Sequence, residues 1–324
     1  MDSLAAAPGT GPATSPLPVL RKPRPAASFK DLPTDRTLVM GILNVTPDSF
    51  SDGGRHATPD TAIAAGLRMF YAGADIIDVG GESTRPGAAG VSVEEEQRRV
   101  LPVVEALVKA GALVSIDTTH AATAEAALAA GAAIINDVSG LTIEPEMLEL
   151  VARSKAPYIL THRRGDANTM DSLADYNDVA AEVAAELAGV RDKLYAAGAA
   201  PEQIILDPGL GFAKNESQNW ELLHNIDVLQ GLGHKVLVAA SRKRFLGSLL
   251  TVAGKAAAPH ERDSATAAVT AISAYRGAWA VRVHDVGPSL DAVKVAARLA
   301  PASSPARPAL PATGPAAPAA PGDS

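Results

Sequence analysis

The chain of 324 residues contains no cysteine, and this absence excludes several kinds of chemistry. Without thiols there is no disulfide framework, no thiolate metal site and no cysteine nucleophile. No apolar run approaches the ~18 residues that a membrane-spanning helix needs. Basic residues are scarce too, since 29 lysines and arginines face 36 aspartates and glutamates, for a formal charge of −7. Nucleic-acid-binding proteins usually present a basic face, so we expect neither a nucleic-acid partner nor a membrane protein.

Proline is concentrated at the two ends of the chain. Residues 1–36 and 301–324 each contain seven of the 24 prolines and little bulky apolar surface. Such segments cannot offset the entropy lost on ordering, so we predict disordered tails over 1–36 and 301–324 and a folded region over 37–300. Asp2 and Pro8 stand where a secretory signal would be basic and then apolar, which favours a cytoplasmic protein.

The region between the tails alternates two kinds of segment. Short apolar runs without alternation are typical of strands buried on both faces, and they cover residues 37–43, 74–80, 112–117, 132–137, 156–161, 203–207, 235–241 and 279–285. Helical spacing occupies residues 59–72, 93–110, 120–130, 145–154, 177–198, 215–230, 261–277 and 288–299. Four of these helices are followed by a residue suited to positive φ, namely Gly73, Gly111, Gly131 and Gly198. Eight strands and eight helices predict a single (β/α)₈ TIM barrel, in preference to a doubly wound sheet.

In such a barrel the chemistry lies at the carboxyl ends of the strands, and polar residues end every predicted strand. Asp117, Asn136, Asp207 and Lys243 come from four different strands. Carboxylates can accept paired N–H bonds from a flat heterocycle, and a lysine can answer a ring carbonyl or nitrogen. The alternative is a purely structural pairing of Asp117 and Asp207 with Lys243 and Arg242.

A second set of rim residues suits an anion. Arg85, Arg282 and His284 offer donors that match phosphate oxygens. Asn44 offers a neutral oxygen to a hard cation such as Mg²⁺ that phosphates also hold. These residues predict a phosphorylated substrate. The alternative for Arg282 is an ion pair with Asp285.

Two further features predict no cofactor site. The GLGF segment of DPGLGFAK lacks the third glycine and the distant acidic residue of a dinucleotide fingerprint. The remaining histidines have no partners at metal-binding spacing, so we expect surface or capping roles for His56, His120, His224, His234 and His260.

Several motifs in order resemble those of the dihydropteroate synthase family. MGILNVTPDSFSDGG (40–54) and GADIIDVGGESTRPG (73–87) resemble its two signature segments. The similarity continues collinearly through SIDT (115–118), INDVSG (135–140), LDPGLGFAK (206–214), SRKRFLG (241–247) and VRVHDV (281–286). It spans the whole core and neither tail.

The resemblance implies a fold and an activity. Members of this family are (β/α)₈ barrels, commonly homodimers. They condense 6-hydroxymethyl-7,8-dihydropterin pyrophosphate with p-aminobenzoate, with Mg²⁺ bound, and release 7,8-dihydropteroate and pyrophosphate. Sulfonamides resemble p-aminobenzoate, so the resemblance also implies competitive inhibition by them.

The resemblance also assigns residues. It implies that Asp117, Asn136, Asp207, Phe212 and Lys243 bind the pterin. It implies pyrophosphate contacts from Asn44, Arg85, Arg282 and His284, with Asn44 as the Mg²⁺ ligand. The implied p-aminobenzoate contacts are Phe50, Thr84, Arg85, Pro86, Ser241 and Lys243.

The mechanism that the resemblance implies is dissociative. The C–O bond to pyrophosphate breaks first and leaves a cation delocalised into the pterin ring. Asp117 stabilises this charge, Lys243 holds the ring, and Arg282 and His284 stabilise the leaving group. The aniline nitrogen then attacks, and no side-chain nucleophile is needed.

This chain departs from the family pattern at four positions. Thr161 and Arg163 replace the two methionines of Leu-Met-His-Met, Ala239 replaces a common glycine, and Arg244 stands where some members have serine. Two other functions therefore remain open at this point. One is a diverged, non-catalytic pterin-binding paralogue, and the other is a pterin-dependent methyltransferase domain.

Overall fold

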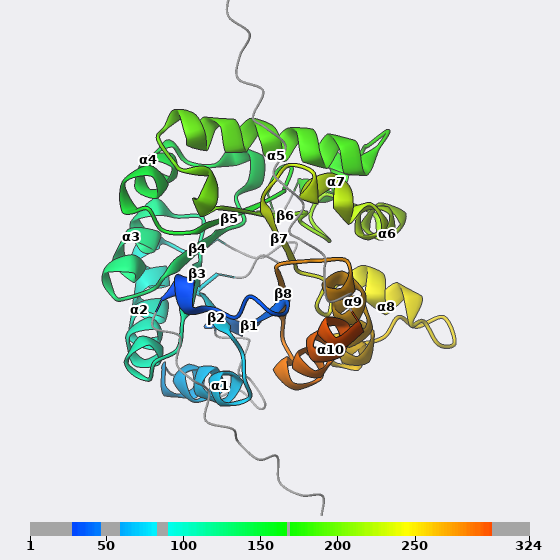
Figure 1. Ribbon diagram of the computed structural model, residues 1–324, viewed down its shortest axis with the longest axis horizontal. Helices are drawn as coiled ribbons and strands as arrows, with labels where there is room; N and C mark the ends of the chain where they lie inside the picture. The colour runs from blue at the N-terminus through cyan, green and yellow to red at the C-terminus, as the bar shows by residue number, and fades with distance from the viewer. Residues whose placement is uncertain (1–27, 47–58, 83–89, 167–168, 300–324) are drawn as a thin grey trace, which may run out of the picture.

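A computed structural model describes residues 28–46, 59–82, 90–166 and 169–299. Its eight strands form one closed parallel barrel in the order β1 to β8, which confirms the predicted TIM barrel (Figure 1). The strands are β1 (Leu38–Asn44), β2 (Ile76–Gly80), β3 (Val114–Asp117), β4 (Ile134–Asp137), β5 (Tyr158–Thr161), β6 (Ile204–Asp207), β7 (Lys235–Val238) and β8 (Ala280–Val283).

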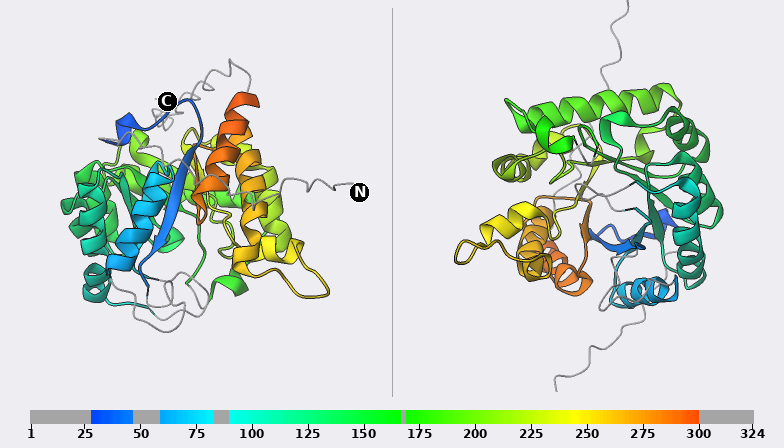
Figure 2. Two further views of the ribbon diagram at one scale, coloured as in Figure 1. Left: turned by 90° about the horizontal axis from the view of Figure 1, so that it is seen from below. Right: turned by 180° about the vertical axis from the view of Figure 1, so that it is seen from behind.

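Helices surround the barrel and join each strand to the next, as the views in Figures 1 and 2 show. They are α1 (Pro59–Tyr71), α2 (Val93–Lys109), α3 (Ala121–Ala129), α4 (Pro145–Ser154), α5 (Val179–Ala196), α6 (Glu216–His224), α7 (Ile226–Gln230), α8 (Arg244–Leu249), α9 (Asp263–Tyr275) and α10 (Val286–Leu299). Short 3₁₀ turns are η1 (Phe29–Asp31), η3 (Gly140–Thr142), η4 (Met170–Leu173), η5 (Pro201–Gln203) and η6 (Pro259–Arg262). Within the described ranges, no helix is long and apolar enough to cross a membrane.

Capping residues and glycines in the sequence mark where several helices begin and end. The Ser92 hydroxyl accepts a hydrogen bond from the Glu95 backbone N–H at 3.3 Å and begins α2, and the Asp178 carboxylate does the same for α5. The four predicted glycines have φ of 102°, 88°, 102° and 101° at positions 73, 111, 131 and 198, which confirms that prediction.

Two helices differ from expectation. The single helix predicted over residues 215–230 is broken at Asn225, whose ψ of 33° ends α6, and a short α7 follows. Helix α8 was not anticipated, because its six residues are too few to show helical periodicity. It begins directly after Lys243, so a site residue lies at its N-terminal end.

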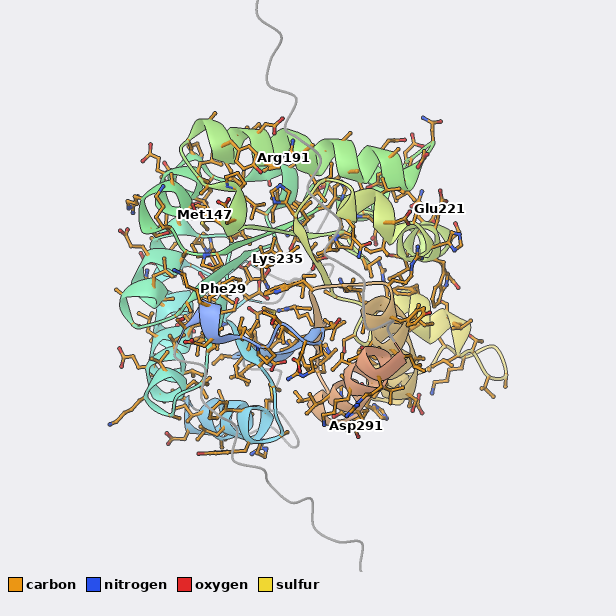
Figure 3. All side chains as sticks on the ribbon, in the orientation of Figure 1. Phe29, Met147, Arg191, Glu221, Lys235 and Asp291 are labelled. Carbon is orange, nitrogen blue, oxygen red and sulfur yellow. The ribbon has the colours of Figure 1, made fainter. Side chains whose placement is uncertain are left out.

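The N-terminal end of the barrel is closed by apolar side chains. Phe29 and Leu32 pack with the inward residues of the strands, and the Phe29 and Trp279 rings are 5.7 Å apart. Figure 3 shows Phe29 and Lys235 lying near one another over the barrel, and the Lys235 Nζ atom is 5.3 Å from the Phe29 ring centre. This corrects the predicted boundary of the N-terminal tail, because residues 28–36 belong to the fold. The rest of that tail and the C-terminal tail lie outside the described residues.

Along β2, β4 and β6, the inward side chains change from apolar to polar at the carboxyl end. Residues two apart on a strand point to the same side of the sheet. Ile76, Ile134 and Ile205 lie in the apolar inner cluster, and Asp78, Asn136 and Asp207 follow them by two residues. The barrel therefore brings these polar groups together at one end.

Candidate active site

Arg282 of β8 lies at this polar end and links two strands, β2 and β3, that stand beyond the neighbouring strand β1. Its Nε atom donates to Asp78 Oδ2 at 2.6 Å, and its Nη2 atom donates to Asp117 Oδ2 at 2.5 Å. Burial lowers the pKa of Arg282, but the two carboxylates outweigh it and the net shift is upward. Arg282 is therefore a permanent cation, and the alternative of an ion pair with Asp285 is wrong, because Arg282 pairs with Asp78 and Asp117 instead.

Asp117 ends β3 and is almost completely enclosed. Burial raises the pKa of this carboxyl to about 7, against the opposing effect of Arg282, and Asp78, Glu96 and Asp137 raise it further. Three neighbouring carboxyl groups, from β2, β4 and the start of α2, thus act on Asp117. The negative charge of Asp117 depends on its cationic neighbour, Arg282.

Lys243 and Phe212 form another part of this end of the barrel. The Lys243 Nζ atom lies 4.4 Å from the centre of the Phe212 ring and donates to the carbonyl oxygen of Leu210. Burial lowers the pKa of Lys243 to about 8, although the carboxylate of Asp207 opposes this. Asp207 is itself buried, which raises its pKa, and its Oδ1 atom accepts a hydrogen bond from Gly209 N–H at 2.7 Å.

Some buried acceptors at this end have no partner among the residues that the structure describes. Asn136 donates through Nδ2 to Asp78 Oδ2 at 2.9 Å, but the Oδ1 atoms of both residues make no hydrogen bond. A buried acceptor without a donor is costly, roughly 1–3 kcal/mol. A ligand with several N–H groups in one plane would satisfy both atoms.

Ser241 and His284 form a pair beside Arg282. The Ser241 hydroxyl accepts the backbone N–H of His284 at 3.1 Å and lies 2.9 Å from His284 Nδ1. Asn44 ends β1, partly exposed, and its Cα atom is in register with that of Gly80 on β2. Met40 of β1 is in register with Arg282 of β8, so Asn44 lies four residues beyond that level, toward the carboxyl end of the barrel.

The structure thus brings together Asp117, Asn136, Asp207, Phe212, Lys243, Arg282, Ser241, His284 and Asn44 at the carboxyl ends of the strands. The other predicted site residues, Phe50, Thr84, Arg85 and Pro86, lie outside the described residues. The alternative pairing of Arg242 with a site carboxylate is wrong, because Arg242 forms a two-pronged ion pair with Asp263 at 2.7 and 2.8 Å.

The four departures from the family pattern occupy different surroundings. Thr161 and Ala239 are buried at the ends of β5 and β7. The Arg163 guanidinium lies 5.9 Å from the centre of the Phe212 ring, and its Nε atom is buried without a hydrogen-bond partner in the described ranges. Arg244 is exposed and bonds to Asp171 Oδ1 at 2.9 Å.

Two residues of the site, Asp78 and Lys214, received no functional role from the sequence. Asp78 stands at the end of a predicted strand, and this position was its only signal. Lys214 is buried, and its Nζ atom donates to the carbonyls of Gly209 and Phe212 at 3.1 and 2.9 Å and lies 2.9 Å from His162 Nδ1. It therefore fixes the turn between Asp207 and Phe212, and nothing in its spacing distinguishes it from a surface lysine.

Comparison with known proteins agrees with this geometry. The chain matches the family described as pterin binding enzyme over residues 40–284. It is 50% identical to the dihydropteroate synthase of Mycobacterium leprae over 259 residues, which cover 79% of this chain and 91% of that protein. It is 43% identical to the dihydropteroate synthase of Bacillus subtilis over 262 residues, covering 81% of this chain and 86% of the relative.

Solved structures give the same result. The dihydropteroate synthase of Yersinia pestis in a sulfonamide drug complex is 41% identical, with a TM-score of 0.77, covering 83% of this chain and 96% of that one. The Xanthomonas albilineans dihydropteroate synthase with 4-aminobenzoic acid is 42% identical, with a TM-score of 0.74, covering 82% and 93%. By its sequence, its barrel and the residues at the carboxyl ends of its strands, the chain belongs to the dihydropteroate synthase family.

Proposed function

We propose that this chain condenses 6-hydroxymethyl-7,8-dihydropterin pyrophosphate with p-aminobenzoate by a mechanism in which the C–O bond breaks before the new C–N bond forms. The observation that carries this proposal is the buried position of Arg282 between Asp78 and Asp117. The Arg282 guanidinium pairs with Asp117, the carboxylate that would stabilise a cationic pterin. Arg282 also lies at the end of the barrel where pyrophosphate would leave. A dissociative transition state requires a negative group near the developing cation and a positive group near the leaving pyrophosphate, and this pair supplies one of each.

Pterin recognition would use the buried acceptors. The 2-amino-4-oxopyrimidine edge of a pterin presents N–H donors in one plane. The partnerless oxygens of Asp78 and Asn136 and the carboxylate of Asp207 are suited to accept them. Lys243 would donate to the ring, and Phe212 would contact its face.

The bond changes follow from this placement. The electrons of the C–O bond leave with pyrophosphate, and the exocyclic methylene becomes a cation conjugated with the ring. Asp117 would stabilise that cation, while Arg282 and His284 would bind the departing oxygens. The amine of p-aminobenzoate then forms the C–N bond and loses its proton to solvent.

Mg²⁺ is part of the proposal, and the position of Asn44 supports it. This amide lies at the rim next to Gly80, partly exposed, and no described side chain or backbone group hydrogen-bonds to its side-chain oxygen. A neutral oxygen ligand of this kind suits a hard cation whose other ligands are phosphate oxygens and water. When bound, Mg²⁺ would supply positive charge to the pyrophosphate.

The second substrate would bind beside Ser241 and Lys243, with Phe50, Thr84, Arg85 and Pro86 as further contacts. Arg85 would also contact pyrophosphate. Sulfonamides have the shape and charge of p-aminobenzoate, so we expect competition with that substrate and none with the pterin.

A homodimer in the cytoplasm completes the proposal. Large apolar side chains remain exposed on neighbouring helices: Ile272 (61%) and Tyr275 (59%) on α9, and Val295 (57%) and Leu299 (67%) on α10. Within each helix the two side chains are three or four residues apart, which places them on the same face of the helix. A second copy of the chain would cover them, and sedimentation of the wild type and of Ile272→Glu would test this. The cytoplasm suits a substrate whose charge bars it from crossing a membrane unaided.

Pyrophosphate release by the purified chain tests the reaction. We expect release only when p-aminobenzoate is present, with dihydropteroate as the product. Ring-substituted p-aminobenzoates of different basicity then test the order of bond changes, because a dissociative step depends only weakly on the attacking amine. A steep dependence of kcat on amine basicity would contradict the dissociative order, and pterin binding without any release would favour the non-catalytic paralogue.

A further inference from the structure

A separate group of side chains lies next to Asp117 and takes no part in the proposed reaction. Glu82 follows β2, Glu96 lies in the first turn of α2, and His120 precedes α3. One ligand atom from each lies within 4.8 Å of the others. Sequence spacing does not show these neighbours of His120, which the fold supplies, and His120 also stands at the N-cap position of α3, as its expected capping role implies.

Glu96 is a fully buried carboxylate without a permanent cationic partner. Its exposure is 0%, and its Oε2 atom accepts the Thr118 hydroxyl at 3.0 Å and lies 3.0 Å from His120 Nδ1. The Oε1 atom is buried and has no hydrogen-bond partner in the described part of the chain. No described lysine or arginine forms an ion pair with Glu96. A buried carboxylate in this state is costly and calls for a positive charge beside it.

Glu82 brings a second carboxylate to the same place. It is half-buried, and burial together with the charge of Glu96 raises its pKa, which His120 and Arg163 oppose. Two carboxylates that face each other in this way need either a shared proton or a shared cation.

We propose that Glu82, Glu96 and His120 bind a divalent transition-metal ion of the Mn²⁺ or Zn²⁺ class. An imidazole nitrogen with two carboxylate oxygens favours these ions over Mg²⁺ and Ca²⁺, which prefer oxygen alone. The 3.0 Å between His120 Nδ1 and Glu96 Oε2 matches the roughly 3 Å between adjacent ligands when metal–ligand bonds are about 2.1 Å. The Thr118 hydroxyl holds the Glu96 carboxylate in place, as outer partners of metal ligands commonly do.

This ion would be distinct from the Mg²⁺ proposed at Asn44. It would need no phosphate ligand, and it would tie the carboxyl ends of β2 and β3 to the start of α2. Metal ligands bind in their deprotonated forms, so the affinity should fall as the pH is lowered.

Titration of the EDTA-treated full-length chain with Co²⁺ tests the proposal, since bound Co²⁺ has visible absorption bands that report its ligands. The titration contains no substrate and no pyrophosphate, and Mg²⁺ is in excess, so the result does not depend on the synthase reaction. We expect one Co²⁺ per chain and a rise in the melting temperature. His120→Ala and Glu82→Gln should each bind at least roughly 10-fold more weakly.

His224→Ala is the matched control, because His224 is exposed and remote in sequence from this group, and it should bind Co²⁺ like the wild type. His120 and Glu82 are only partly buried, so their variants should fold, and circular dichroism checks this. The proposal is overturned if the wild type fails to bind Co²⁺ up to millimolar concentration, or if His120→Ala binds as tightly as the wild type. A shared proton would then be the better account, and Glu96→Gln would raise the melting temperature without any metal.

Discussion

Ile76, Ile134 and Ile205 point into the N-terminal half of the barrel, whereas Asp78, Asn136 and Asp207 point into its C-terminal half, two residues further along the same strands. The first half is closed by Phe29, Leu32 and Trp279, which pack on its apolar inner cluster. The second half buries carboxylates with cations. The inward-facing side chains, which recur at every second residue of a strand, therefore stabilise the barrel at one end and carry its chemistry at the other. The predictions below test how far the two ends are independent.

The largest effect should come from Asp117→Asn. The variant keeps the shape of the side chain but removes the charge opposite Arg282, so the cationic transition state loses its main electrostatic stabilisation. We expect kcat to fall by about 10²–10³-fold, with little change in melting temperature. Asp285→Asn, at the same rim but without a bond to Arg282, serves as the control and should retain activity. Equal losses in both variants would mean that the whole rim is disturbed.

A matched pair on β4 compares the two ends directly. Ile134→Ala removes a fully buried side chain from the apolar half and should lower the free energy of unfolding by about 2–5 kcal/mol, with kcat/KM per folded molecule near the wild-type value. Asn136→Ala should instead raise the Kd for the pterin substrate by roughly 10-fold or more, since Asp78 and the ligand both lose a hydrogen-bond partner. Urea unfolding and calorimetry measure the two effects. If Ile134→Ala also impaired pterin binding, the two ends would not be independent.

The pH dependence of kcat/KM should be bell-shaped and narrow. Asp117 must be ionised, and its pKa of about 7 makes activity fall as the pH drops below that value. Lys243 must be protonated, and its pKa of about 8 makes activity fall as the pH rises above it. Lys243→Arg should move the alkaline limb to higher pH, because arginine stays charged. An alkaline limb that does not move in this variant would assign it to another group.

The smallest effect should come from Arg244→Ala. Its ion pair with Asp171 is exposed on both sides, so we expect a loss of less than about 1 kcal/mol in stability. The KM for p-aminobenzoate should not change, because Arg244 is already paired away from Lys243 and Ser241. A clear rise in this KM, measured beside an unchanged KM for the pterin, would show that Arg244 contacts the second substrate.

The sequence predicts the barrel well because its signals are local. Apolar runs, helical spacing and Gly73, Gly111, Gly131 and Gly198 each act over a few residues. The boundary at residues 28–36 could not be placed, because Phe29 and Leu32 gain their stability from strands far away in the sequence. The break at Asn225 and the short α8 are likewise decided by tertiary packing.

For the site, strand ends and family motifs identify most of the polar residues that the structure brings together. They do not reveal which charges pair. Asp78 rather than Asp285 bonds to Arg282, and Arg242 turns away to Asp263. Lys214 and the group around His120 depend on contacts between segments distant in sequence, so no spacing rule could identify them.

The position of Lys243 has a consequence for chemical labelling. With a pKa of about 8, its amine is uncharged roughly 200 times more often at neutral pH than an ordinary lysine amine with a pKa near 10.4. An uncharged amine is a nucleophile. Small acylating reagents should therefore modify Lys243 before they modify the surface lysines. A pterin analogue with an electrophile near its ring would be placed to form a covalent bond with the Lys243 amine.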